Sequence, residues 1–143
     1  TGGKALKDGD FKYGYFLEPT LFDGGHDRMR IWQEEVFGPV LLASQVSTLE
    51  EAIHQANAVR FGLTSAIYTQ DLSNAMRFVE EVEAGMIHVN SPTIGGEPQI
   101  PFGGFKDTAV GAREMAKEGI EFFSEPKSVF LDYTGTARKA NIY

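Results

Sequence analysis

Hydrophobic and polar positions follow two different periods through the middle of the chain. Residues 40–46, 63–69 and 86–90 are short runs rich in apolar and β-branched side chains, which is typical of buried strands. The stretches between them repeat apolar residues three or four positions apart, which indicates amphipathic helices. This order of elements, with short connections, predicts an α/β fold in which right-handed crossovers make the three strands parallel.

Local signals predict where the two helices begin and end. Thr48 and Glu51 have the spacing of a capping box, so we expect a first helix from that point to a stop at Gly62. The second helix is expected to stop at Gly85. The apolar stripe expected on the second helix consists of Leu72, Ala75, Met76, Val79 and Val82.

The two ends of the chain are less regular than its middle. Residues 14–22 have strand-like aromatics interrupted by a proline, and residues 27–35 can hold a helical turn. Residues 90–111 hold five of the sixteen glycines and three of the six prolines, which is typical of a surface loop. A helix is expected at 112–118, and the β-branched and aromatic content of residues 127–133 predicts a strand.

Composition changes this picture through charge and cysteine content. The 143 residues are 42% hydrophobic, and 20 acidic against 13 basic side chains give a net charge of −7. A negative chain opposes binding to phosphate backbones and anionic membranes, so we expect no nucleic-acid or membrane partner. The chain has no cysteine, which excludes thiol catalysis by these residues and fits the cytoplasm; its three scattered histidines predict no metal site.

Two short motifs carry candidate chemistry. The first, Glu34-Glu35-Val36-Phe37-Gly38-Pro39, places two carboxylates and an aromatic ring before a turn into the first predicted strand. A carboxylate there can accept two hydrogen bonds from a sugar, but the pattern alone is more typical of a solvated acid pair beside a core Phe. The second, Pro101-Phe102-Gly103-Gly104-Phe105-Lys106, either lets another surface approach its glycines and flat rings or forms a simple turn.

The order and spacing of these motifs resemble the NAD(P)-dependent aldehyde dehydrogenase superfamily. The matching segments are Gly14-Tyr15-Phe16, Pro19-Thr20, residues 34–39, Phe61-Gly62-Leu63, Asn90, residues 101–106 and residues 125–129. The resemblance is to the C-terminal part of family members. It implies that residues 1–120 are the C-terminal part of a catalytic domain, with a mostly parallel sheet and flanking helices. It also implies that residues 121–143 are an oligomerisation strand, or arm strand, with a tail.

The resemblance implies binding roles for five residues. Glu35 corresponds to the family glutamate that hydrogen-bonds the nicotinamide ribose of NAD or NADP, and Phe37 to the phenylalanine that packs beside the nicotinamide. Phe102 corresponds to an aromatic that lines the aldehyde tunnel. The loop before Phe102 resembles the loop that discriminates substrates, with Thr93 and Ile94 as its candidate contacts. Lys106, by contrast, is expected to be a salt-bridge or surface residue.

Catalysis in the resembled family depends on residues that this chain lacks. An upstream cysteine attacks the aldehyde, hydride passes to nicotinamide, and an upstream glutamate helps to hydrolyse the thioester. We therefore expect no catalytic residue in this chain, and no activity from it alone. The complete enzyme is expected to be a homodimer or homotetramer that oxidises a small aldehyde. The amino-acid sequence of residues 90–97 most resembles that of semialdehyde enzymes such as 2,5-dioxopentanoate dehydrogenases.

Two other functions stay open at this point. One is a non-enzymatic α/β interaction module built on the same scaffold. The other is a family relative that reduces acyl phosphates or acyl-CoA to aldehydes.

Overall fold

The strands of this α/β structure pair two by two. The computed structural model describes residues 1–133 and residue 135, and within them the strands form four two-stranded sheets. The antiparallel pairs are β1 (Ala5–Leu6) with β2 (Phe16–Leu17), and β5 (Phe61–Gly62) with β8 (Phe105–Lys106). The parallel pairs are β3 (Thr20–Phe22) with β4 (Val40–Leu42), and β6 (Thr64–Ile67) with β7 (Met86–Val89).

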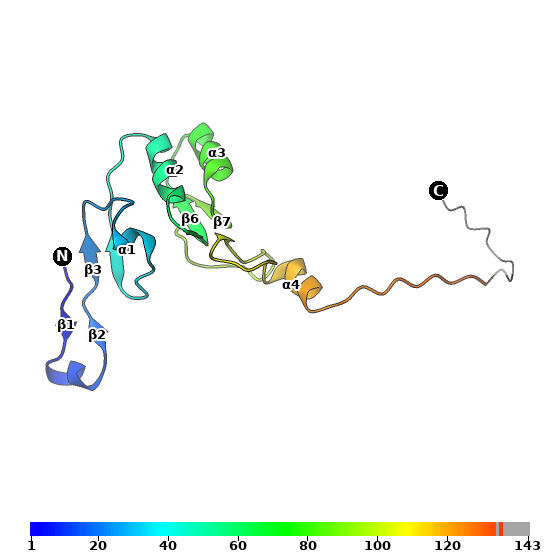
Figure 1. Ribbon diagram of the computed structural model, residues 1–143, viewed down its shortest axis with the longest axis horizontal. Helices are drawn as coiled ribbons and strands as arrows, with labels where there is room; N and C mark the ends of the chain where they lie inside the picture. Colours follow the sequence, from blue (N-terminus) through cyan, green and yellow to red (C-terminus); the bar gives the residue numbers. More distant parts are fainter. Residues whose placement is uncertain (134, 136–143) are drawn as a thin grey trace.

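Helices accompany these pairs along an elongated chain (Figure 1). They are a 3-10 helix η1 (Gly9–Tyr13), α1 (Arg30–Gln33), α2 (Leu49–Asn57), α3 (Leu72–Glu81) and α4 (Ala116–Phe122). Helices α2 and α3 lie beside β6 and β7 in the middle of the molecule, whereas α1 lies beside β3 nearer the N-terminal end. The helical turn expected in residues 27–35 and the strands expected in residues 14–22 are confirmed.

The three central strands do not form one sheet as expected. β6 and β7 are parallel, with Thr64 opposite Met86 and Ile67 opposite Val89, as expected for strands joined by a helical crossover through α3. β4, however, pairs with β3, which comes from the less regular N-terminal region. A hydrophobic pattern indicates that a segment is a strand but says nothing about its partner, so the prediction of a single three-stranded sheet was wrong.

Helix α2 begins where the capping signal predicts and ends earlier than expected. The Glu51 backbone N–H donates to Thr48 Oγ1 at 3.1 Å, and the Glu51 carboxylate accepts from the Ser47 backbone N–H at 2.8 Å. The helix ends at Asn57 rather than at Gly62. Gly62 lies instead in β5. Its close backbone neighbours, described below, leave no room for a side chain, which explains why this position is a glycine.

Helix α3 buries two residues of the expected stripe, Ala75 and Val82, and leaves the other three exposed. Its buried side chains are Ala75 and Phe78, and Val82 at its C-cap is buried with them. Of the expected stripe, Leu72 is 74% exposed, and Met76 and Val79 are also exposed. The core consists of Ile53, Phe78, Val82 and Ala84, with Leu49, Ile67 and Ile87 packed against it. Helix α3 is therefore rotated so that its aromatic residue, Phe78, packs against β6, β7 and α2.

Three glycine-containing segments cross with their backbones in direct contact. A Cβ atom added to Gly85 would lie 2.0 Å from the carbonyl oxygen of Gly103, and one added to Gly62 would lie 2.2 Å from that of Glu83. The Gly85 N–H donates to the Gly62 carbonyl at 3.0 Å. Gly85 is therefore required by this close approach; it is not the stop of α3, which ends at Glu81.

The C-terminal elements also differ from expectation. Helix α4 covers Ala116–Phe122 instead of residues 112–118, because residues 112–115 hold an isolated bridge between Phe102 and Glu114. Residues 127–133, expected as the arm strand, are assigned no strand in the single chain and extend away from the other elements (Figure 1). A strand needs a pairing partner, so the arm strand stays a prediction.

The chain exposes far more surface than a compact protein of its mass. Its accessible surface is 11972 Å², whereas a folded monomer of 15.7 kDa exposes about 7,300 Å². Exposed aromatic side chains contribute from near the N-terminus to residue 133, including Tyr15, Phe37 and Phe130. The described helices are all too short or too polar to cross a membrane. This excess surface is what a segment buried against further polypeptide would show.

The glycine crossing leads to a stability prediction. Gly85→Ala should lower the free energy of unfolding by about 1–3 kcal/mol, because its methyl group would overlap the Gly103 carbonyl oxygen. Gly96→Ala is the matched control, since its Cβ would meet nothing closer than Phe102 at 4.0 Å. Urea unfolding of the two variants measures the difference, and equal midpoints would contradict the tight crossing.

Candidate functional site

The first candidate site lies where α1 leads into β4. Glu35 and Phe37 both line a hollow of about 530 Å³. Its other lining residues are Ile31, Val36, Gly38, Val40 and Leu42. The Phe37 side chain is 96% exposed, so it is not the core residue that the alternative interpretation of this motif required. A carboxylate and an uncovered ring beside the same hollow are suited to a ligand with hydroxyl groups and a flat apolar part.

The two carboxylates of this motif have different surroundings. Glu34 forms an ion pair with Arg30, one helical turn earlier, at 2.7 Å. Glu35 lines the hollow instead. The two carboxylates therefore differ in their surroundings: Glu34 pairs with Arg30 of the short helix α1, and Glu35 lines the candidate site.

Helix α1 is held in place by the amide of Gln33. Gln33 Nε2 donates to the carbonyl oxygens of Asp27 and Ala58, each at 2.8 Å. The first bond closes the loop that contains α1, and the second ties α1 to the residue after α2. Because Gln33 precedes Glu35 by two positions, these bonds orient the segment that lines the hollow.

The second candidate site surrounds Phe102. A second hollow, of about 600 Å³, lies between this residue and the segment that leads into α4. Its lining includes Leu63, Gly103, Gly104, Met115, Phe122 and Phe123. Phe102 is fixed by two backbone hydrogen bonds with Glu114, at 2.7 and 2.8 Å. The Arg113 guanidinium lies 4.9 Å above the Phe105 ring and also donates to the Gly104 carbonyl.

The structure brings some of the expected binding residues together and leaves others apart. Glu35 and Phe37 share one hollow, and Phe102 lines the other; the two hollows have no lining residue in common. Thr93 and Ile94 lie on an exposed loop and line neither hollow, with Ile94 79% exposed. In the chain by itself these two residues are apart from both hollows, although their loop passes near Phe102 at Gly96, and their roles stay predictions.

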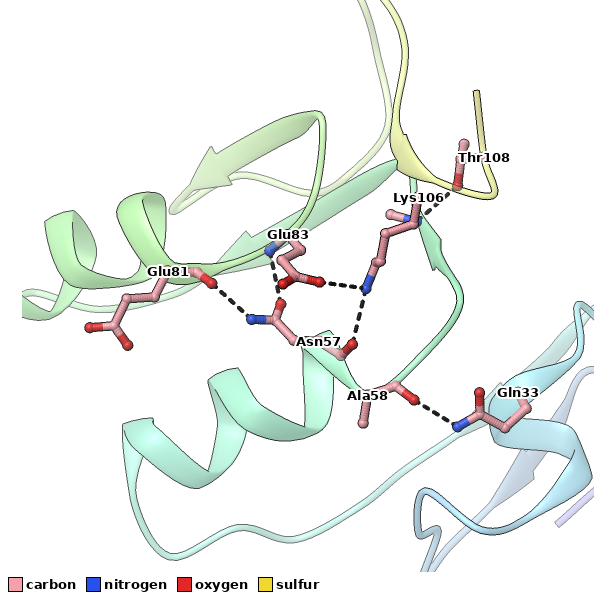
Figure 2. Close-up of polar contacts among 8 residues, drawn as sticks. Gln33, Asn57, Ala58, Glu81, Glu83, Lys106 and Thr108 are labelled. Carbon is pink, nitrogen blue, oxygen red and sulfur yellow. Dashed lines mark hydrogen bonds and ion pairs between the residues drawn. The ribbon is translucent and has the colours of Figure 1, made fainter. Parts of the chain in front are cut away.

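Lys106 belongs to a polar network that sequence reasoning found only in part. Its ammonium lies 3.3 Å from a Glu83 carboxylate oxygen, which confirms the expected salt bridge. The same ammonium donates to the Asn57 carbonyl at 3.0 Å (Figure 2). The Lys106 side chain is only 22% exposed. Its backbone φ of +53° is unusual for a residue other than glycine, which shows how firmly its surroundings hold it.

Asn57 is the member of this network that sequence reasoning missed. Its side-chain amide donates to the Glu81 carbonyl at 2.8 Å and accepts from the Glu83 N–H at 2.8 Å (Figure 2). No signal in the sequence pointed to this role, because the helix was expected to run on to Gly62 and Asn57 lay within it; in the structure α2 ends at Asn57, where side chains often satisfy backbone groups. The described residues contain no cluster of three metal-ligating side chains.

Comparisons with known proteins show which family the chain is similar to. The model of the aldehyde dehydrogenase family matches residues 1–129. The chain is 48% identical over 118 residues to 2,5-dioxopentanoate dehydrogenase of Saccharolobus solfataricus, covering 82% of this chain and 25% of that protein. It is 38% identical over 130 residues to alpha-ketoglutaric semialdehyde dehydrogenase of Bacillus subtilis, covering 91% of this chain and 27% of that protein.

Solved structures are similar over the same region. An NAD-dependent aldehyde dehydrogenase from Sinorhizobium meliloti matches with a TM-score of 0.83 and 32% identity, covering 97% of this chain and 26% of that one. Betaine aldehyde dehydrogenase from Staphylococcus aureus in complex with NAD+ matches with a TM-score of 0.81 and 37% identity, covering 86% and 24%. The chain thus spans about a quarter of the length of these relatives. With the family model matched over nearly its whole length, the chain belongs to the aldehyde dehydrogenase family.

Proposed function

We propose that this chain supplies the cofactor-side and aldehyde-side walls of an NAD(P)-dependent aldehyde dehydrogenase. The observation that carries the proposal is the placement of Glu35 and Phe37 on one hollow, in a chain that belongs to this family. The reaction is the oxidation of an aldehyde to a carboxylic acid. Relatives spanning about four times the length of this chain carry aldehyde dehydrogenase names, which supports the same reaction class here.

The residues of the first hollow fit the nicotinamide half of the cofactor. The Glu35 carboxylate is an acceptor for the two ribose hydroxyls, and its charge makes those hydrogen bonds stronger than neutral ones. The Phe37 ring offers an apolar face that excludes water from one side of the nicotinamide. When bound, NAD(P) supplies the hydride acceptor; these two residues bind and orient it.

The nucleophile of the proposed reaction has to come from another polypeptide segment. The chain contains no cysteine, so it cannot itself form a thioester with the substrate. Its exposed surface is large enough for extensive contact with such a segment. The work of this chain is therefore binding and positioning, in which small displacements can have large effects on rate.

The substrate we propose is a small semialdehyde, received by the hollow around Phe102. The similarity to 2,5-dioxopentanoate and alpha-ketoglutaric semialdehyde dehydrogenases supports this class. No Arg or Lys occurs between Arg77 and Lys106, and Arg113 already serves the Gly104 carbonyl and the Phe105 ring. The cation that would bind a substrate carboxylate is therefore proposed to come from outside this chain.

We also propose a cytoplasmic homodimer or homotetramer for the complete enzyme. The support is the exposure of Val129, Phe130 and Leu131, which are between 65% and 91% exposed in the single chain. An extended apolar segment of this kind is suited to pairing with the sheet of a second subunit.

The cofactor role of Glu35 can be tested in the full-length dehydrogenase that contains this chain. Glu35→Gln should lower kcat/KM for the cofactor by about tenfold to a hundredfold, because an amide replaces a charged acceptor of two hydrogen bonds. Steady-state kinetics with varied NAD and NADP measure the effect. Glu34→Gln is the matched control, since Glu34 pairs with Arg30 and should change these constants little. Wild-type kinetics in Glu35→Gln would refute the assigned role.

The role of Phe102 predicts a change of specificity. Phe102→Ala should change the ratio of kcat/KM between a short and a long aldehyde by about tenfold, because it enlarges the hollow, while KM for the cofactor stays the same. Tyr68→Ala removes an exposed aromatic ring outside both hollows and serves as control. An equal loss with every aldehyde would count against tunnel lining.

The missing nucleophile predicts that the 143-residue chain alone is inactive. Purified chain incubated with NAD and an aldehyde should produce no NADH, measured by absorbance, because it has no cysteine. Aldehyde-dependent NADH production by the pure chain would show that the chemistry does not need an outside thiol.

A further inference from the structure

Two consecutive carbonyl groups at the end of α2 accept hydrogen bonds from side chains of the two segments that lead to the candidate sites. The Asn57 carbonyl accepts from Lys106 Nζ at 3.0 Å, and the Ala58 carbonyl accepts from Gln33 Nε2 at 2.8 Å. Figure 2 shows the two donors arriving at this helix end from different elements, Gln33 from α1 and Lys106 from β8. Carbonyls at a helix end have no partner within the helix and carry partial negative charge, so they bind such donors well.

The Gln33 side of this junction leads directly to the cofactor-side wall. Both hydrogens of the Gln33 amide are used, one on Asp27 in the same loop and one on Ala58. Glu35 follows two residues later. A shift of α1 relative to α2 would therefore move the carboxylate that lines the first hollow.

The Lys106 side leads just as directly to the aldehyde-side wall. Lys106 pairs with Phe61 across the β5–β8 ladder, and the next residue, Asp107, donates its N–H to the Arg60 carbonyl at 3.0 Å. Between Lys106 and Phe102 lie Gly103 and Gly104, whose backbones are in tight contact with neighbouring segments. This stretch has little freedom to absorb a displacement of Lys106.

The end of α2 is itself anchored, so it can serve as a fixed reference. The Asn57 amide bonds the backbone of Glu81, the last residue of α3, and of Glu83, two residues after it. Glu83 also pairs with Lys106, which closes a ring of contacts among α2, the end of α3 and β8. Because these contacts share Asn57, Glu83 and Lys106, we expect the loss of one to loosen the others.

We propose that the C-terminal end of α2, at Asn57 and Ala58, is a positioning junction that sets the separation between the Glu35–Phe37 segment and the Phe102 segment. Gln33 and Lys106 are its positioning residues. The expected effect on the kinetics of the enzyme rests on the proposed function. The coupling of the two segments through α2 rests on the hydrogen bonds alone.

The kinetic test uses Lys106→Met in the full-length dehydrogenase. Lys106 is on the aldehyde side, yet the variant should raise KM for the cofactor by about threefold to tenfold, because the junction transmits the change to Glu35. A purely structural loss would reduce the amount of active enzyme and hence the apparent kcat, leaving KM unchanged. Lys117→Met, which removes an exposed ion pair on α4, is the matched control and should leave KM at the wild-type value.

Hydrogen exchange tests the coupling without any activity. In Lys106→Met, amides of residues 28–37 should exchange about fivefold faster, and in Gln33→Met those of residues 102–108 should do the same. Gln70→Met is the control for the second variant, since Gln70 is exposed and lies outside the network. The two reciprocal variants keep the test decisive if one of them fails to fold.

The outcomes separate the two proposals. If the wild-type full-length protein does not oxidise aldehydes, the proposed function is refuted. The hydrogen-exchange experiment then still decides whether the two segments are coupled. If each variant speeds exchange only around its own site, or if Lys106→Met leaves KM for the cofactor unchanged in an active enzyme, the positioning junction is refuted.

Discussion

The backbone-to-backbone crossing of three glycine-containing segments is the constraint on which the candidate site depends. A side chain at Gly62 or Gly85 would occupy the position of a carbonyl oxygen, so only glycine allows this approach. The crossing places β8 against β5 and the segment after α3 beside both. Phe102 and Lys106, on either side of the glycine pair at residues 103 and 104, take their positions from it. The family motifs at these positions therefore have a structural role first.

The single chain is organised around surfaces that it does not cover. Its core is small, with no large side chain among the described residues fully buried, and its exposed area exceeds that of a compact monomer by more than half. Both hollows are open to solvent. Glu35 and Phe37 line one of them, and Phe102 lines the other. Such a chain is suited to orienting ligands that other parts of the full-length protein also hold. This agrees with the absence of a cysteine nucleophile from its sequence.

Part of the site could be predicted because its signals are local. The motif around Glu35 and Phe37 lies within a few residues, and the structure places both on one hollow. The network at the end of α2 could not be predicted in full, because its hydrogen bonds join residues between 24 and 49 positions apart. Neither Gln33 nor Asn57 stands out in a pattern of hydrophobic and polar positions. Their importance comes from carbonyl groups that only the folded chain brings within reach.

By itself the sequence determined the type and order of the central elements, the start of α2 and the parallel pairing of β6 with β7. These features depend on side-chain period, capping groups and crossover handedness, which act over short stretches. Only the tertiary structure decided that β4 pairs with β3, that Phe78 rather than Met76 is buried, and that Gly85 serves a close approach. Each of these depends on which distant segment lies alongside, and that is settled by packing across the whole chain.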